Sequence, residues 1–172
     1  VELLTGTAVT IDSNHAVTNE GRIVVTNAAG GVGISANAGS SGDIVVATGG
    51  VITVDETYAP TDSDNDGDLD GPFATGSGRF GIRTLGAHTG KLTNNGTITV
   101  EGNDSAGIWL GGPLTGAFTH DGRTQVIGDR SVAPRVELAA GLTGTDPRCV
   151  VSIVGCAGDW TGGWDCTLPG GA

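Results

Sequence analysis

The sequence predicts an all-β solenoid, a parallel β-helix with repeats of about 26 residues, and three observations lead to this fold class. The 172 residues include 32 glycines, no methionine and only seven aromatic side chains, so small side chains have to fill the core. Clusters of Val, Ile and Thr such as "VITV" and "TITV" favour strands, and no stretch shows the periodicity of a helix. The same short set of signals also recurs along the chain.

The first copy of the repeat is the stretch "VTNEGRIVVTNAAGGVGI". It contains a polar corner at Thr18-Asn19-Glu20-Gly21, a strand of the form x-Ile-x-Val, a small polar turn, and then Gly33-Ile34. The stretch from Gly50 to Val54 supplies the strand half of the next copy. We therefore expect each repeat to consist of two or three very short strands joined by turns.

Two later copies follow at an offset of 26 residues, because Gly96 aligns with Gly122 and Gly81-Ile82 aligns with Gly107-Ile108. The same alignment places Asn94 over His120, and the order of signals places Asn19 at an equivalent corner. We expect these three side chains to occupy equivalent positions in their coils.

A unit of this length cannot bury its apolar face alone, so neighbouring units have to stack. Strands repeated at a constant offset then pair in parallel, with Val, Ile, Leu and Thr inside and Gly at the corners. A β-propeller needs about 40 residues per blade, and a β-sandwich needs no fixed period, so both alternatives fit the sequence less well.

An acidic run, "TDSDNDGDLDG", interrupts the repeats between Val54 and Gly81. About 20 residues more stand there than in the corresponding corner after Val100, so the run is predicted to project as a loop spanning residues 55–77. Alternating carboxylates can converge on one cation, which the oxygen preference of calcium suits, and Gly67 allows a sharp turn. The predicted calcium ligands are Asp62, Asp64, Asp66, Asp68 and Asp70.

The loop pattern is similar to the calcium loops of thrombospondin type 3 repeats and, over its first six positions, to those of EF-hands and dockerins. An EF-hand is not predicted, because Phe73 stands where its bidentate Glu would be and no helix-forming sequence flanks the loop. An acidic loop without a ligand, which only keeps the surface soluble, is the alternative. Mutual repulsion of five carboxylates argues against that alternative, because ordering them without a cation is costly.

The charge of the chain is concentrated in the same place. The sequence has 19 acidic and 8 basic residues, and seven of the acids lie between residues 55 and 70. Without those seven, the net charge of −11 becomes −4. Nucleic acid is not expected as a partner, since Lys and Arg are few and do not cluster. No apolar run is long enough to span a membrane.

Other candidate sites are weaker. The three histidines, His15, His88 and His120, stand beside turns and are predicted to be exposed corner residues rather than ligands. Arg79 and Arg83 follow the acidic loop and are expected to balance its charge or face solvent. No catalytic constellation of carboxylates and a base is seen at a convincing spacing, so the chain is predicted not to be an enzyme.

The last segment differs from the rest. We divide the chain into a repeat region, residues 1–144, and an atypical segment, residues 145–172, which holds all three cysteines and two tryptophans. One interpretation is a cap over the open end of the solenoid. The other is a sequence that does not belong to the native reading frame. The absence of methionine leads us to expect that the chain begins after a processing or cloning cut.

The pieces "VTIDSN", "GRFGIR" and "LTNNGTITVEGNDSAGI" resemble passenger domains of bacterial autotransporters, the type V secretion proteins. The resemblance covers approximately Val9 to Val136 and implies a right-handed parallel β-helix at or beyond the bacterial cell surface. It implies adhesion, aggregation or display, with surface molecules of a host or neighbouring cell, or carbohydrate, as partners. The alternatives are a carbohydrate-active β-helix enzyme similar to polysaccharide lyases, and a filament formed by end-to-end self-association.

Overall fold

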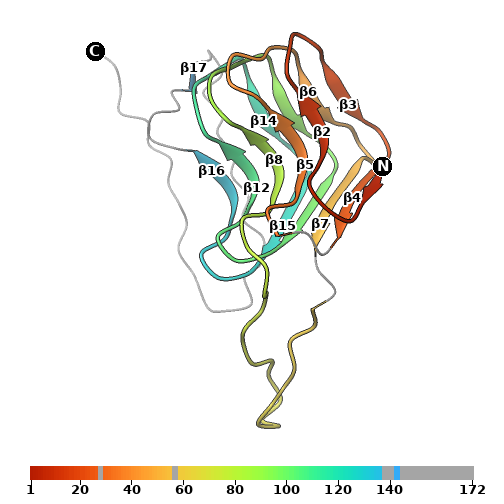
Figure 1. Ribbon diagram of the computed structural model, residues 1–172, viewed down its shortest axis with the longest axis vertical. Helices are drawn as coiled ribbons and strands as arrows, with labels where there is room; N and C mark the ends of the chain where they lie inside the picture. The colour runs from red at the N-terminus through yellow and green to blue at the C-terminus, as the bar shows by residue number, and fades with distance from the viewer. Residues whose placement is uncertain (27–28, 56–57, 137–141, 144–172) are drawn as a thin grey trace, which may run out of the picture.

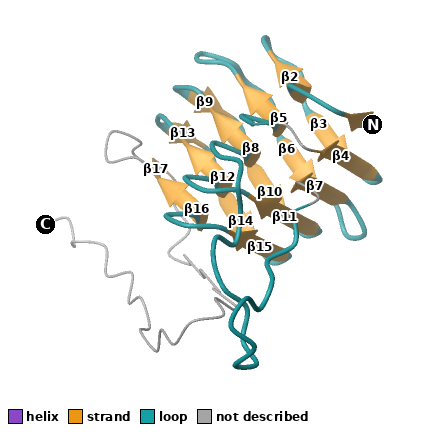
Figure 2. Cartoon of the chain, turned by 60° about the horizontal axis from the view of Figure 1, so that its bottom comes forward, coloured by secondary structure: helices purple, strands orange, loops and turns teal. Residues whose placement is uncertain are grey.

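The computed structural model of the protein describes residues 1–26, 29–55, 58–136 and 142–143, and within them the predicted fold class is confirmed. The chain winds into a parallel β-solenoid of about five turns and contains no helix in this part. Figures 1 and 2 show the coils stacked side by side along one axis, with β1 to β3 at one end. The atypical segment 145–172 lies outside the described residues. Nowhere in the described part is there a helical segment of the length and hydropathy that a bilayer crossing needs.

Within the described residues, four parallel sheets, here named A to D, run along the solenoid. Sheet A contains β1 (Glu2–Leu3), β4 (Arg22–Thr26), β7 (Val51–Asp55), β11 (Thr97–Glu101) and β15 (Arg123–Ile127). Sheet B contains β2 (Thr7–Ile11), β5 (Val32–Ala36), β8 (Phe80–Thr84), β12 (Ala106–Leu110) and β16 (Val132–Val136). Sheet C contains β3 (Val17–Asn19), β6 (Ile44–Val46), β10 (Leu92–Asn94) and β14 (Phe118–His120). Sheet D contains β9 (His88–Thr89), β13 (Leu114–Thr115) and β17 (Leu142–Thr143).

The registers confirm the spacing read from the sequence. Thr97 pairs with Arg123 in sheet A, and Ile82 pairs with Ile108 in sheet B, each at an offset of 26 residues. The first coils are less regular, since Arg22 pairs with Val51 at an offset of 29. Side chains alternate between inside and outside along each strand, so every coil adds β-branched residues to one continuous core. In sheet A these core residues are Ile23, Val25, Ile52, Val54, Ile98 and Val100.

The three predicted corner positions lie in sheet C. Asn94 pairs with His120 of the next coil, and Val46 stands between Asn94 and Asn19 in the register. Asn94 holds the corner in shape, because its Oδ1 accepts a hydrogen bond from the N–H of Gly96 at 3.1 Å. Its amide nitrogen donates to Thr124 Oγ1 at 3.3 Å, which links two coils. Equivalence of the three sites is therefore confirmed.

The prediction that all three histidines are exposed is correct for His15 but wrong for His88, whose relative exposure is 1%, and His120 is only partly exposed. His88 Nε2 lies 2.9 Å from the carbonyl oxygen of Gly42, so this nitrogen has to carry the proton. The other ring nitrogen, Nδ1, then accepts a hydrogen bond from Ser40 Oγ at 2.9 Å. His88 pairs with Leu114 in sheet D and replaces an apolar core residue, with its two polar atoms satisfied inside the molecule.

Candidate calcium-binding loop

The acidic run lies on a long loop at the corner between sheets A and B. Residues 56–79 connect β7 to β8, whereas only residues 102–105 connect β11 to β12 one coil later. The predicted insertion is therefore present in the structure, and Figure 1 shows the loop extending away from the solenoid. The scaffold itself is continuous across the insertion, because β7 and β8 pair with their neighbours on both sides.

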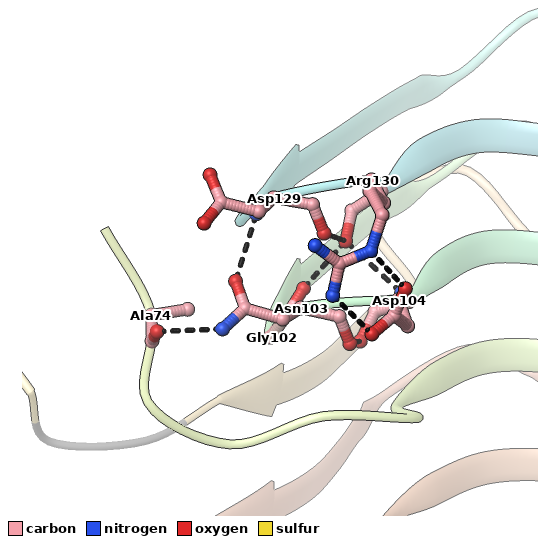
Figure 3. Close-up of polar contacts among 8 residues, drawn as sticks. Ala74, Gly102, Asn103, Asp104, Asp129 and Arg130 are labelled. Carbon is pink, nitrogen blue, oxygen red and sulfur yellow. Dashed lines mark hydrogen bonds and ion pairs between the residues drawn. The ribbon is translucent and has the colours of Figure 1, made fainter. Parts of the chain in front are cut away.

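The returning arm of the loop is fixed to the corner of the next coil through Asn103 (Figure 3). The Asn103 side-chain amide donates to the carbonyl of Ala74 at 2.9 Å, and its backbone N–H donates to the carbonyl of Gly76 at 2.7 Å. Its own carbonyl accepts from the N–H of Gly78 at 2.9 Å. Ala74 is fully buried at this junction. The returning arm therefore pairs with the solenoid along a short edge, where these backbone N–H and carbonyl groups are hydrogen-bonded.

Arg79 lies beneath this arm, and the expectation that it faces solvent is wrong, because its relative exposure is 2%. Its Nη1 donates to the carbonyl oxygen of Glu101 at 2.6 Å, and its backbone N–H donates to Ser105 Oγ at 3.0 Å. A Cβ on Gly76 would lie 2.2 Å from Nη2, so a larger residue there would require the guanidinium to shift. A buried guanidinium needs such partners to offset its desolvation. Arg79 thus stabilises the base of the loop.

Polar contacts connect Asn103 and Asp104 at this corner to Asp129 and Arg130 in the next coil (Figure 3). Asn103 Oδ1 accepts from the N–H of Asp129 at 2.8 Å. Arg130 makes a two-pronged contact with Asp104, with Nε to Oδ1 at 2.6 Å and Nη2 to Oδ2 at 2.7 Å. Both side chains are exposed, at 70% and 52%, so solvent screens the ion pair and it adds little to stability. The backbone ladder, rather than this pair, holds the corner.

The tip of the loop is folded by its own aspartates. Asp62 Oδ2 accepts from the N–H of Gly67 at 3.1 Å, and Asp64 Oδ1 accepts from the N–H of Asp66 at 3.2 Å. Asp66 Oδ1 accepts in turn from the N–H of Asp68 at 3.1 Å. Gly67 has a φ of 102°, a conformation that side chains other than hydrogen disfavour. Glycine at this position is therefore what allows the tip to turn, as the sequence indicated.

Three of the five predicted ligands converge. One carboxylate oxygen from each of Asp62, Asp64 and Asp70 lies within 4.8 Å of the other two. Asp66 and Asp68 are on the same tip but do not belong to this group. Calcium binds oxygen at 2.3–2.6 Å, so two ligands on opposite sides of one ion are about 5 Å apart. The spacing of the three carboxylates thus suits one calcium ion.

Asp62 carries a second indication. Its Oδ1 is buried, and no described residue donates a hydrogen bond to it. A buried carboxylate oxygen without a donor is costly, because it has lost water and gained nothing in exchange. A cation bound between Asp62 and its two neighbours would satisfy that oxygen. It would also offset the electrostatic repulsion among the three carboxylates.

Asp70 closes the tip, and Ser63 is the residue that sequence reasoning missed. The Ser63 hydroxyl and backbone N–H both donate to Asp70 Oδ2, and the N–H of Asp70 donates to the carbonyl of Thr61 at 3.0 Å. The hydroxyl contact first, and then the backbone contact, lower the pKa of Asp70 below its usual value of 3.8. A serine between two aspartates is a weak signal, because spacing alone does not show which distant carboxylate it meets.

Replacing Ser63 with alanine is expected to raise the pKa of Asp70 toward 3.8, since the hydroxyl donor is lost. The folded-state pKa is depressed, so the contact contributes stability at pH values above the unfolded pKa and loses it as pH falls through the folded pKa. Carboxyl-carbon NMR titration of wild type and Ser63→Ala in calcium-free buffer measures this. An identical Asp70 midpoint in both proteins would contradict the contact.

Comparisons with family models, curated proteins and solved structures gave no match to this chain.

Proposed function

We propose that this protein is a non-enzymatic β-solenoid module in which calcium holds the shape of one acidic side loop. The observation that carries the proposal is the convergence of Asp62, Asp64 and Asp70 around a space that suits one ion. Asp66 and Asp68 belong to the same five-aspartate set and lie on the same tip, but outside the converging group. Backbone carbonyls and water would supply the remaining ligands of a six- to eight-coordinate ion.

The role of the ion is structural in this proposal. The base of the loop is already fixed by Asn103 and Arg79, whereas the tip is held by contacts among its own charged residues. Calcium binding would therefore order the tip rather than the solenoid. In this proposal an ordered tip would hold Tyr58, Pro60, Pro72 and Phe73 of the same loop in a fixed arrangement.

The resemblance of the repeats to autotransporter passengers supports a place outside the bacterial cell, where calcium is plentiful and binding sites can be weak. Adhesion, aggregation or display is the corresponding role, with cell-surface molecules or carbohydrate as partners. An antibody against the protein should then label intact cells of the source bacterium. Labelling that requires lysis would contradict the proposed location.

The calcium proposal is tested by hydrogen exchange of the loop amides. Addition of about 1 mM calcium is expected to slow exchange at Ser63, Gly67 and Asp70 about tenfold or more, because ordering the tip protects their hydrogen bonds. Amides of buried strands such as β11 (Thr97–Glu101) serve as an internal control and should not change. Chelation with EGTA should reverse the effect, and magnesium at the same concentration should not reproduce it. Unchanged loop exchange at millimolar calcium would contradict the proposal.

A further inference from the structure

A chemically reactive pair of residues lies at the corner that joins sheet C to sheet A. Asn95-Gly96 is the only asparagine-glycine pair in the sequence. It connects β10 (Leu92–Asn94) to β11 (Thr97–Glu101), and Asn95 is exposed whereas Gly96 is buried. An asparagine followed by glycine is prone to deamidation, because glycine has no side chain that keeps its backbone nitrogen away from the asparagine amide.

The reaction takes place within the chain and needs only water. The backbone nitrogen of Gly96, having lost its proton, attacks Cγ of Asn95. A nitrogen–carbon bond forms and closes a succinimide ring, and the side-chain amide takes up a proton and leaves as ammonia. Water then opens the ring at either carbonyl, which gives aspartate or isoaspartate. Isoaspartate carries the main chain through the former side chain, so the backbone becomes longer by one methylene.

In the folded chain the attacking nitrogen is held by the residue that precedes the pair. The N–H of Gly96 donates to Oδ1 of Asn94 at 3.1 Å, and Asn94 is fully buried. An asparagine often caps the backbone two residues further on in this way. The N–H of Asn95 is also engaged, because it donates to the carbonyl of Val46 in the preceding coil at 2.8 Å. Both backbone nitrogens of the reactive pair are therefore hydrogen-bonded.

Gly96 is also packed closely against the preceding coil. A Cβ at Gly96 would lie 2.2 Å from the carbonyl oxygen of Gly50. The same carbonyl accepts a hydrogen bond from the N–H of Thr97 at 2.9 Å, so it is fixed in place. The nitrogen of Gly96 therefore cannot turn toward Cγ of Asn95 unless this corner opens locally.

The preceding coil turns the same corner with a longer connection. Residues 47–50 join β6 (Ile44–Val46) to β7 (Val51–Asp55), and both Thr48 and Gly49 are exposed. No described residue accepts a hydrogen bond from the N–H of Gly49. A Cβ at Gly49 would have no atom within 4 Å. One corner of the solenoid thus offers two surroundings for an asparagine-glycine pair, a closed one at residues 95–96 and an open one at residues 48–49.

We propose that Asn95 is a conditional deamidation site, which Asn94 and the preceding coil keep closed in the folded solenoid and which opens when this corner unfolds. Isoaspartate at this position makes the change irreversible. Its additional methylene separates Asn95 from Gly96, so the N–H groups of Asn95 and Thr97 no longer fit the carbonyls of the preceding coil together. The site is independent of calcium and of the acidic loop, and it goes beyond the proposed function.

The test is to introduce a second asparagine-glycine pair through Thr48→Asn and to follow both pairs in the same folded protein. After incubation at mildly alkaline pH, mass spectrometry of proteolytic peptides distinguishes asparagine, aspartate and isoaspartate at each site. The introduced asparagine is expected to deamidate about tenfold faster than Asn95 or more, because its glycine is neither hydrogen-bonded nor packed. Both sites should react at similar rates in denaturing urea. Equal rates in the folded protein would overturn the proposal, and so would a difference that persists in urea.

Asn94→Ala tests the capping residue. It is expected to raise the rate at Asn95 about threefold or more, the effect of one lost hydrogen bond. Thr124→Val is the matched control, because it removes the partner of the Asn94 amide nitrogen but leaves Oδ1 in place. Its rate should remain near that of wild type, and hydrogen exchange of the β11 amides shows whether each variant keeps the solenoid. Equal acceleration in the two variants would overturn the role of Asn94. The comparison based on Thr48→Asn does not depend on the folding of Asn94→Ala.

Discussion

Replacing Gly81 with alanine is expected to lower the free energy of unfolding by about 3 kcal/mol. A Cβ at this position would lie 2.4 Å from Cγ2 of the buried Ile98 and 2.5 Å from the carbonyl oxygen of Gly107 in the next coil. Neither neighbour can move away easily, because Ile98 is part of the core and the carbonyl belongs to β12, which is paired on both sides in sheet B. Gly33 stands in the same row, where its own Cβ would meet the carbonyl of Gly81 at 2.5 Å.

Gly21→Ala provides the matched control for Gly81→Ala. Gly21 is exposed, a Cβ there would have no atom within 4 Å, and its φ lies outside the left-handed region. The control is expected to change stability by about 0.5 kcal/mol or less. Thermal unfolding distinguishes the two, because about 3 kcal/mol corresponds to about 6–12 °C in a domain of this size. Equal midpoints for both variants would show that sheets A and B are not packed as closely as the structure indicates.

The glycine row explains why the repeat could be found in the sequence at all. Gly33-Ile34, Gly81-Ile82 and Gly107-Ile108 served as landmarks because they recur, although the sequence does not say why glycine is needed. The structure supplies the reason, which is the close approach of successive coils at that position. The spacing between copies was predictable for the same reason, since a row that must remain glycine fixes the register.

Predictions of side-chain exposure were wrong where the position of a residue in the repeat does not determine its surroundings. His88 stands beside a turn, like His15, yet it is buried because sheet D brings it over Ser40 and the carbonyl of Gly42. Arg79 follows a charged loop, yet the arm of that loop folds over it. Both outcomes depend on contacts between residues at least 22 positions apart, which a local pattern does not contain.

The acidic loop is an intermediate case. Its position and its turn at Gly67 followed from the sequence, and so did the candidate ligands. Alternation of five aspartates does not show which of them converge, because the chain reverses direction within the run. The turn at Asn65 and Gly67 brings Asp70 back to Asp62 and Asp64, whereas Asp66 and Asp68 lie outside this group.

This geometry leads to a second large effect: Asp64→Asn is expected to weaken calcium binding about tenfold or more, which is about 1.4 kcal/mol. Asp64 belongs to the converging group, so the substitution removes a negative ligand from the ion. Asparagine retains an Oδ1 that can accept the hydrogen bond from the N–H of Asp66. The loss should therefore reflect coordination rather than a misfolded tip. Isothermal titration with calcium measures the affinity.

Asp68→Asn is the matched variant, because it removes the same charge from the same tip at a residue outside the converging group. Electrostatic attraction of calcium by the loop as a whole falls equally in both variants, so the difference between them isolates direct coordination. Asp68→Asn is expected to weaken binding by about threefold or less, the effect of one exposed charge. A loss as large as that of Asp64→Asn would mean that calcium responds to the total charge of the loop. Asp62, Asp64 and Asp70 would then have no special role, and the proposed ion site would be replaced by a diffuse one.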